Sequence, residues 1–215
     1  MADDYHPALA TYLYHDRNFD ADAAKLLPGE YYVTNRDMLI VTVLGSCVAA
    51  CIRDPQNGIG GMNHFMLPDG ESNPSSRSAR YGTYAMEILI NHITRMGARR
   101  ANLEAKVFGG GNVLPGMTVA NVGERNAEFV LRFLETAKIR VAARDLVDVY
   151  PRKVYYFPKT GRVLVKKLRN LHNNTLFERE EVYSSRLQKF NVGGDAQLSS
   201  RSGDGAPAAM VRQVS

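Results

Sequence analysis

Both cysteines of the chain and one of its five histidines lie in the segment LGSCVAACIRDPQNGIGGMNHFMLP, residues 44–68. Cys47 and Cys51 are four positions apart, and His64 lies seventeen residues after Cys47. Four interpretations fit these residue types: a metal site, a redox pair, core packing, or a thiol nucleophile with its base. The spacing lacks the second close ligand pair of a zinc site, and a Cys-x-x-Cys redox motif is absent. Packing and nucleophilic chemistry therefore stay open.

The residues around Cys47 favour an activated thiol. A cysteine attacks as its thiolate, which a helix N-terminus or a neighbouring histidine stabilises. Gly45 permits a sharp turn, Ser46 is a good N-cap, and the small apolar residues that follow are typical of a short helix. We therefore predict that Cys47 occupies the first helical position, where unpaired N–H groups lower its pKa and can hold an oxyanion. Cys51, one helical turn further on, is predicted to be an inert core residue.

His64 is the natural base for this thiolate, although a lone histidine on a strand is more often a packed core or surface residue. Gly60 and Gly61 allow close approach of the backbone just before it. The turn sequence DPQNG can fold its strand back beside Cys47. The positions of the two side chains in the fold therefore decide whether they act together.

The flanking segments predict the elements that position this pair. Residues 38–44 and 59–67 read as strands, and apolar residues recurring at i, i+3 and i+4 over 81–96 predict an amphipathic helix that ends at Gly97. NLEAKVF predicts a strand before the GGGN loop, and Asn121 with Glu124 resembles a capping box for a second long helix. Further strands are predicted at KIRVAARDLVDVY, RKVYYF and GRVLVKKL, and the last two are joined by a hairpin turn at PKTG.

Length and composition favour a single domain. The 215 residues, 45% of them hydrophobic, suffice for one sizeable core. We predict a domain over residues 25–170, an N-terminal extension over 1–24, and a C-terminal extension over 171–215. The last is expected to be largely disordered, with a short helix possible at LFEREEVYSSRLQKF.

Charge and hydropathy exclude several classes of function. The net charge of +5 comes from basic residues dispersed among acidic ones, so a solvated basic face is favoured over nucleic-acid binding. No apolar run approaches the roughly 20 residues of a membrane span, and the first residues lack the pattern of a secretion signal. We expect a cytoplasmic protein that does not insert into the membrane and keeps its thiols reduced.

The motif TVLGSCVAACIRDP followed by GGMNHFMLP resembles the signature of the CheD family of bacterial chemoreceptor glutamine deamidases. The resemblance continues through LLPGEYYVT, EAKVFGGGNV, NVGERN and YYFPKTGRVLVKKL. It implies an α+β fold similar to the deamidating domain of cytotoxic necrotising factor toxins. That fold is an α/β/β sandwich with a mostly β core and two long helices.

The same resemblance implies a catalytic triad. Cys47 is the nucleophile, His64 the proton carrier and Thr42 the third member that orients the imidazole. Ser46 and Asn63 are alternatives for this third position, since some family members have one more residue between the threonine and the cysteine.

The implied reaction is the conversion of a receptor glutamine to glutamate. The thiolate attacks the carboxamide, ammonia leaves, and water hydrolyses the thioester. Gly45 and Ser46 support the oxyanion, and Gly109 and Gly110 of the GGGN loop shape substrate access. No metal or organic cofactor is required. Chemotaxis receptors are the implied protein substrate, and a CheC phosphatase is an implied partner.

Two other functions stay open. The same thiol chemistry serves cysteine proteases and transglutaminases, which attack a different bond or use a different acyl acceptor. The chain could also be a non-catalytic adaptor that docks on receptors or on a CheC-type phosphatase, with Cys47 and His64 as buried packing.

Overall fold

The computed structural model describes residues 7–68, 77–113, 122–169 and 175–189. Its three α-helices are α1 (Arg77–Arg95), α2 (Val122–Thr136) and α3 (Thr175–Lys189). Its strands, in chain order, are β1 (Ala8–Leu9), β2 (Tyr12–Asp16), β3 (Ala21–Lys25), β4 (Glu30–Thr34), β5 (Leu39–Leu44), β6 (Val48–Asp54), β7 (Ile59–Asn63), β8 (Glu104–Gly109), β9 (Arg140–Leu146), β10 (Arg152–Phe157) and β11 (Arg162–Lys167).

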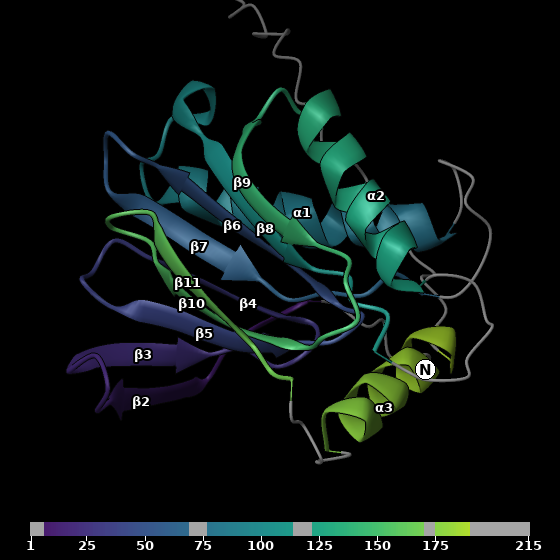
Figure 1. Cartoon of the computed structure of the whole chain (residues 1–215). Helices are drawn as coiled ribbons and strands as arrows, with labels where there is room; N and C mark the ends of the chain where they lie inside the picture. Colours follow the sequence, from purple (N-terminus) through teal and green to yellow (C-terminus); the bar gives the residue numbers. More distant parts are fainter. Residues whose placement is uncertain (1–6, 69–76, 114–121, 170–174, 190–215) are drawn as a thin grey trace, which may run out of the picture.

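The strands form two sheets that pack face to face (Figure 1). The six-stranded sheet has the order β1-β4-β7-β6-β8-β9, and the five-stranded sheet has the order β11-β10-β5-β3-β2. Helices α1 and α2 cover the other face of the six-stranded sheet, so the layers are α/β/β. The predicted α+β class with a mostly β core is confirmed, whereas the similarity to the toxin domain stays a prediction.

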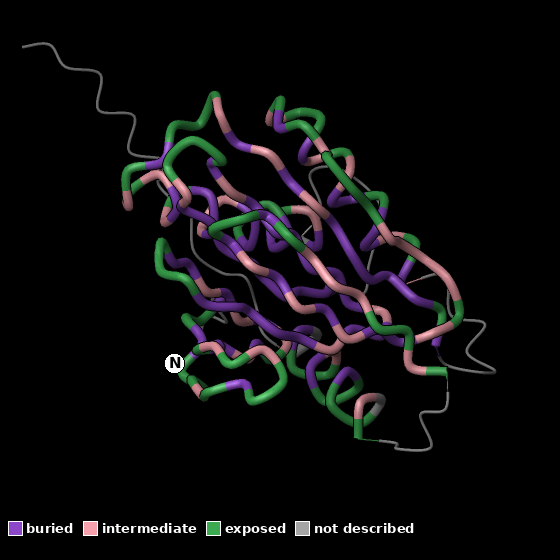
Figure 2. The backbone as a smooth tube through the Cα atoms, turned by 60° about the vertical axis from the view of Figure 1, so that its left-hand side comes forward, coloured by how far each residue is buried: buried purple, intermediate pink, exposed green. Residues whose placement is uncertain are grey.

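The predicted short helix at Cys47 is wrong, because Val48–Asp54 is the strand β6. This strand lies in the middle of the six-stranded sheet, between β7 and β8, with helices on one face and the second sheet on the other. Residues 48–52 are buried without alternation, as Figure 2 shows for the centre of this sheet. A short apolar run covered on both faces has no period that distinguishes strand from helix.

Strands β6 and β7 form the hairpin that the DPQNG turn predicted. Cys47 comes directly before β6 and His64 directly after β7, so antiparallel pairing brings both to the open end of the hairpin. A backbone bridge between Val48 and Phe65 extends the pairing to that end. The hairpin therefore brings together two residues that are seventeen positions apart.

Other predicted elements are also present. The amphipathic helix α1 is followed by Gly97 at a φ of +108°, and the β10–β11 hairpin turns at PKTG. The N-terminal extension contributes β2 and β3 to the five-stranded sheet, and α3 lies in the C-terminal extension. Asn121 of the expected capping box and the tail from residue 190 lie outside the described residues. Among the helices of the described part of the chain, none is long and apolar enough to cross a membrane.

Asp54 anchors the turn of the β6–β7 hairpin. Its carboxylate accepts hydrogen bonds from the backbone N–H groups of Gln56, Asn57 and Arg99 and from the Asn57 side chain. Burial alone would raise the pKa of this carboxyl, but the hydrogen bonds outweigh burial and lower it from 3.8 to about 2. The charged form is therefore the one that the fold stabilises.

We predict that Asp54→Ala lowers the free energy of unfolding by roughly 3 kcal/mol at neutral pH, because several buried donors lose their acceptor. A depressed carboxyl pKa stabilises the fold above 3.8, and this contribution is lost as the pH falls toward about 2. The stability difference between wild type and variant should therefore shrink across that window in denaturant titrations. A difference independent of pH would contradict the role of the charge.

Candidate active site

A row of backbone N–H groups precedes β6 and points at one carboxylate. The N–H groups of Gly45 and Ser46 donate to the two oxygens of Glu180, each at 2.8 Å, and that of Cys47 donates at 3.3 Å. The Ser46 hydroxyl adds a fourth bond of 2.6 Å. Three converging N–H groups form the kind of site that stabilises an oxyanion. Gly45 and Ser46 thus lie where an oxyanion site was predicted, although no helix supplies the N–H groups.

The orientation of these N–H groups is set from the opposite side of the backbone. The carbonyls of residues 45–47 accept hydrogen bonds, all of 2.8 Å, from the Gly111 N–H, the Asn126 side chain and the Gly110 N–H in turn. Because each peptide unit is planar, a fixed carbonyl turns the next N–H in the opposite direction. The bonds to the Gly45 and Ser46 carbonyls, from the loop after β8 and one α2 side chain, therefore aim the N–H groups of Ser46 and Cys47 before any substrate arrives.

Gly109 and Gly110 are needed for this support. Both have positive φ, +110° and +66°. A Cβ on Gly109 would lie 2.2 Å from the Cys47 carbonyl oxygen, and one on Gly110 would lie 2.6 Å from that of Gly123. Any side chain would push the loop away from the cysteine. Their predicted part in substrate access stays a prediction.

The imidazole of His64 is held by Thr42. Thr42 Oγ1 lies 2.8 Å from His64 Nδ1 and 3.0 Å from the carbonyl oxygen of Leu26. Since that carbonyl can only accept, the hydroxyl donates to it, and Nδ1–H donates to the hydroxyl oxygen. Nε2 is then the unprotonated nitrogen. Asn63 binds a β6 N–H and an α1 carbonyl instead, so it does not contact the imidazole.

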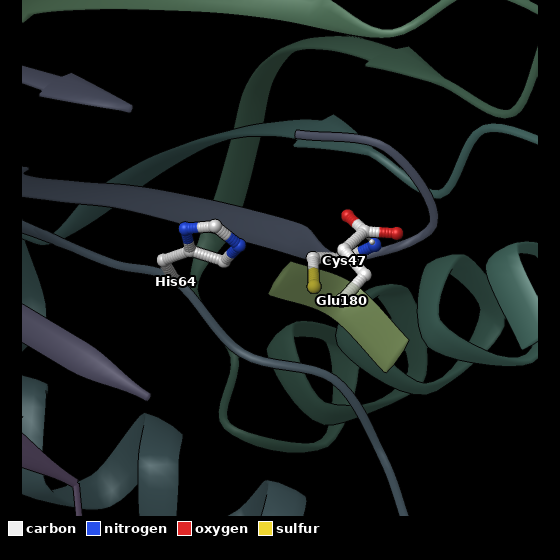
Figure 3. Close-up of side chains that lie close together, drawn as sticks. All are labelled: Cys47, His64 and Glu180. Carbon is white, nitrogen blue, oxygen red and sulfur yellow. Dashed lines mark hydrogen bonds between the residues drawn. The ribbon is translucent and has the colours of Figure 1, made fainter. Parts of the chain in front are cut away.

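The free nitrogen of His64 points toward the thiol (Figure 3). Cys47 Sγ, a ring nitrogen of His64 and a carboxylate oxygen of Glu180 all lie within 4.8 Å of one another, and all three residues are buried. Nε2 has no hydrogen-bond partner among the described residues. A buried imidazole nitrogen beside a thiol is placed to take its proton.

Burial favours the neutral form of both groups, contrary to the predicted low pKa of the cysteine. Burial raises the pKa of the Cys47 thiol well above its usual value, and the Glu180 carboxylate raises it further through charge repulsion and a hydrogen bond. Burial also lowers the pKa of His64 to about 3, only partly opposed by the Leu26 carbonyl. The predicted cause, a helix N-terminus, is absent because β6 is a strand.

The same three side chains could also hold a metal ion. Thiolate, imidazole and carboxylate are zinc ligands, and their donor atoms lie close together. In this geometry both oxygens of Glu180 already accept N–H bonds from the backbone before β6. The carboxylate therefore has partners without a metal, and chelation distinguishes a metal site from a metal-free one.

Two residues of the site were not predicted. Glu180 lies in the segment of the C-terminal extension where a short helix was considered, and Asn126 was not among the predicted site residues. Asn126 is fully buried, where its amide bridges the Ser46 carbonyl and the Leu67 N–H. A buried Asn inside an amphipathic helix is a signal that sequence alone offers. For Glu180 the sequence has no comparable signal, because it contacts residues more than 130 positions away.

Cys51 is buried in β6, as the core assignment predicted. Its thiol pKa is raised by burial, and it has no part in the cluster around Cys47. The two cysteines therefore differ in their surroundings. Cys47 lies in the cluster with His64 and Glu180, whereas Cys51 packs in the core.

Fold and site together define a class of protein. It is an α+β protein with a cysteine and a histidine beside converging N–H groups, the arrangement that thiol-dependent acyl-transfer enzymes use. The family model described as CheD chemotactic sensory transduction matches residues 66–167. Proteins named probable chemoreceptor glutamine deamidase CheD match far more of the chain, and the chain belongs to the CheD family.

The similarity to these relatives extends over nearly their whole length. The protein from Janthinobacterium sp. (strain Marseille) is 68% identical, covering 88% of this chain and 95% of its own. The protein from Methylobacillus flagellatus is 62% identical, covering 92% of this chain and all of its own. A crystal structure of the Bacillus licheniformis hypothetical protein YfiH aligns over 68% of this chain with 13% identity and a TM-score of 0.35, too low to indicate a shared fold.

We predict that His64 carries its proton on Nδ1 and stays neutral from about pH 5 to 8, because its pKa lies near 3. In Thr42→Val, which removes the acceptor at nearly constant volume, Nδ1 loses its partner and the protonated-Nε2 tautomer should appear. Nitrogen chemical shifts of labelled histidine report both states. A titration of His64 near pH 6.5 in the wild type, or an unchanged tautomer in the variant, would refute this assignment.

Proposed function

We propose that the protein is a chemoreceptor glutamine deamidase, which hydrolyses specific receptor glutamines to glutamate and releases ammonia. The observation that carries the proposal is the set of N–H groups at residues 45–47 converging beside the Cys47–His64 pair. The names and the high identity of the relatives point to the same activity. The substrate is then a chemotaxis receptor, and we propose residues 25–170 as the catalytic domain.

In the proposed mechanism, His64 Nε2 takes the proton of Cys47 as Sγ attacks the side-chain carboxamide of glutamine. The N–H groups of residues 45–47 stabilise the negative oxygen of the tetrahedral intermediate. His64 returns the proton to the departing nitrogen, the C–N bond breaks, and ammonia leaves. Water, deprotonated by the same imidazole, then hydrolyses the thioester to glutamate and the free thiol.

Thr42 has a positioning function in this mechanism. By accepting the Nδ1–H bond it keeps the basic nitrogen facing the sulfur, as the third member of a triad does. A hydroxyl carries no charge, so it stabilises the imidazolium less than a carboxylate would. A transient imidazolium is sufficient, because His64 passes the proton from the thiol on to the departing nitrogen.

The rival functions differ in their products. A protease would cleave the receptor backbone, and a transglutaminase would incorporate an added amine. A non-catalytic adaptor would leave the receptor unchanged.

We propose that the protein acts in the cytoplasm, on the cytoplasmic helices of the receptors, and that a CheC-type phosphatase is a second partner.

We predict that Cys47→Ala abolishes deamidation of a receptor cytoplasmic fragment, because the variant lacks the thiol that carries the acyl group in the proposed mechanism. Intact mass spectrometry measures it, since each deamidation adds about one dalton. Cys51→Ala is the matched control: it removes the other thiol, costs about 1 kcal/mol of stability, and should keep near-wild-type activity.

The products discriminate among the rivals. Ammonia release without backbone cleavage or amine incorporation supports the deamidase. Full deamidation by Cys47→Ala would disprove the mechanism, and a wild-type protein that binds the fragment without changing its mass would favour the adaptor.

We also predict that exhaustive chelation leaves the rate of deamidation unchanged, because every proton and acyl transfer is carried by Cys47 and His64. The assay compares enzyme dialysed against EDTA with untreated enzyme, before and after addition of Zn²⁺. A loss on dialysis that Zn²⁺ restores would instead indicate that the buried cluster holds a metal.

A further inference from the structure

Helix α3 reaches the candidate active site through one narrow face. Glu180, Tyr183 and Leu187, at positions i, i+3 and i+7, are its buried residues among those described. Tyr183 and Leu187 join the main hydrophobic core, and the Tyr183 hydroxyl lies 2.6 Å from that of Tyr81 on α1. The neighbouring Glu181 and Val182 are exposed. The helix is thus seated on the domain with a single carboxylate inserted into the site.

The carboxylate of Glu180 is held in the manner of a ligand. It is 3% exposed, and its four hydrogen bonds come from residues 45–47, all within the candidate oxyanion site. Among the salt bridges of the described residues, none involves Glu180, although a buried carboxylate usually pairs with a cation. The backbone donors take the place of that cation.

The space that Glu180 occupies exists because residue 45 is glycine. A Cβ on Gly45 would lie 2.8 Å from either Glu180 oxygen. The turn before Cys47 therefore leaves room for a side-chain carboxyl or carboxamide to lie against its N–H groups. A glutamine carboxamide has nearly the same shape as a glutamate carboxylate, and its oxygen can accept the N–H bonds that one Glu180 oxygen takes from Gly45 and Cys47.

We propose that α3 is an intramolecular inhibitor that occupies the substrate-binding surface, with Glu180 in the position of the product glutamate. This inference rests on the proposed function, because glutamate on a protein helix is the product of that reaction. A receptor helix must then displace α3 and adopt a similar pose, with its reacting glutamine between the row of N–H groups and Cys47.

The inserted carboxylate adds to the effect of burial in keeping the resting thiol neutral. Its negative charge beside Sγ opposes formation of the thiolate, and its oxygens fill the position of the tetrahedral oxyanion. Release of α3 removes both obstacles at once. A substrate glutamine carries no charge, so its oxygen can accept from the N–H groups of Gly45 and Cys47 without repelling the thiolate.

Alkylation of the two cysteines tests the occlusion without relying on catalysis. In Glu180→Ala, iodoacetamide should modify Cys47 at least about tenfold faster than in the wild type, because the charged hydrogen bonds that seat α3 are lost. Peptide mapping separates Cys47 from Cys51, whose slow labelling verifies that the variant is folded. Glu181→Ala, on the exposed face, is the matched control and should label at the wild-type rate.

Receptor deamidation measured in parallel separates this proposal from the proposed function. Faster labelling of Cys47 together with faster deamidation by Glu180→Ala supports both. Unchanged labelling with Cys51 protected overturns the inhibition by α3, whatever the deamidase activity. Faster labelling without deamidation by any form of the protein would leave the occlusion intact and refute the deamidase function.

The isosteric variant Glu180→Gln gives a second test that keeps a side chain of the same size at the site. The introduced glutamine presents its carboxamide to Cys47, so the site should attack it: the C–N bond breaks, ammonia leaves, and water hydrolyses the thioester to regenerate glutamate. Mass mapping should show this reversion in Glu180→Gln but not in Glu180→Gln with Cys47→Ala. Persistence of the glutamine in a protein that deamidates receptors would show that Glu180 does not occupy the position of the reacting side chain.

Discussion

Pairing of β6 with β7 is the constraint on which the site depends. The turn anchored by Asp54 closes one end of this hairpin, and Cys47 and His64 lie together at the other. Because the hairpin is buried between the helices and the second sheet, neither residue can shift without breaking ladder hydrogen bonds. The same burial desolvates the thiol and the imidazole, which favours the neutral form of both at rest.

Each layer of the sandwich supplies one part of the proposed chemistry. The six-stranded sheet carries the thiol and the imidazole, and the five-stranded sheet contributes Thr42, which fixes the tautomer of that imidazole. From the helical layer, Asn126 holds a carbonyl and so aims an N–H group at the oxyanion position. The site therefore depends on the packing of all three layers rather than on one local motif.

Much of this arrangement could be predicted from the sequence. The DPQNG turn, the strand that contains Thr42 and the amphipathic helix α1 have strong local signals, and the CheD-like motif singled out Cys47, His64 and Thr42. The segment after Cys47 was misread as a helix, because a run of small apolar residues buried on both faces has no diagnostic period. Glu180 was missed because its contacts with residues 45–47 are long-range, and nothing in the local sequence of α3 indicates them.

The central claim is that a carboxamide of the substrate reacts with Cys47 Sγ while its oxygen lies against the N–H groups of residues 45–47. Rapid acid quenching of the enzyme mixed with a receptor fragment, followed by mass mapping, tests it most directly. The account predicts a thioester between Cys47 and a receptor glutamine position, heavier than the enzyme by the fragment less one ammonia. Burst release of ammonia with no adduct on Cys47 at any quench time would contradict it.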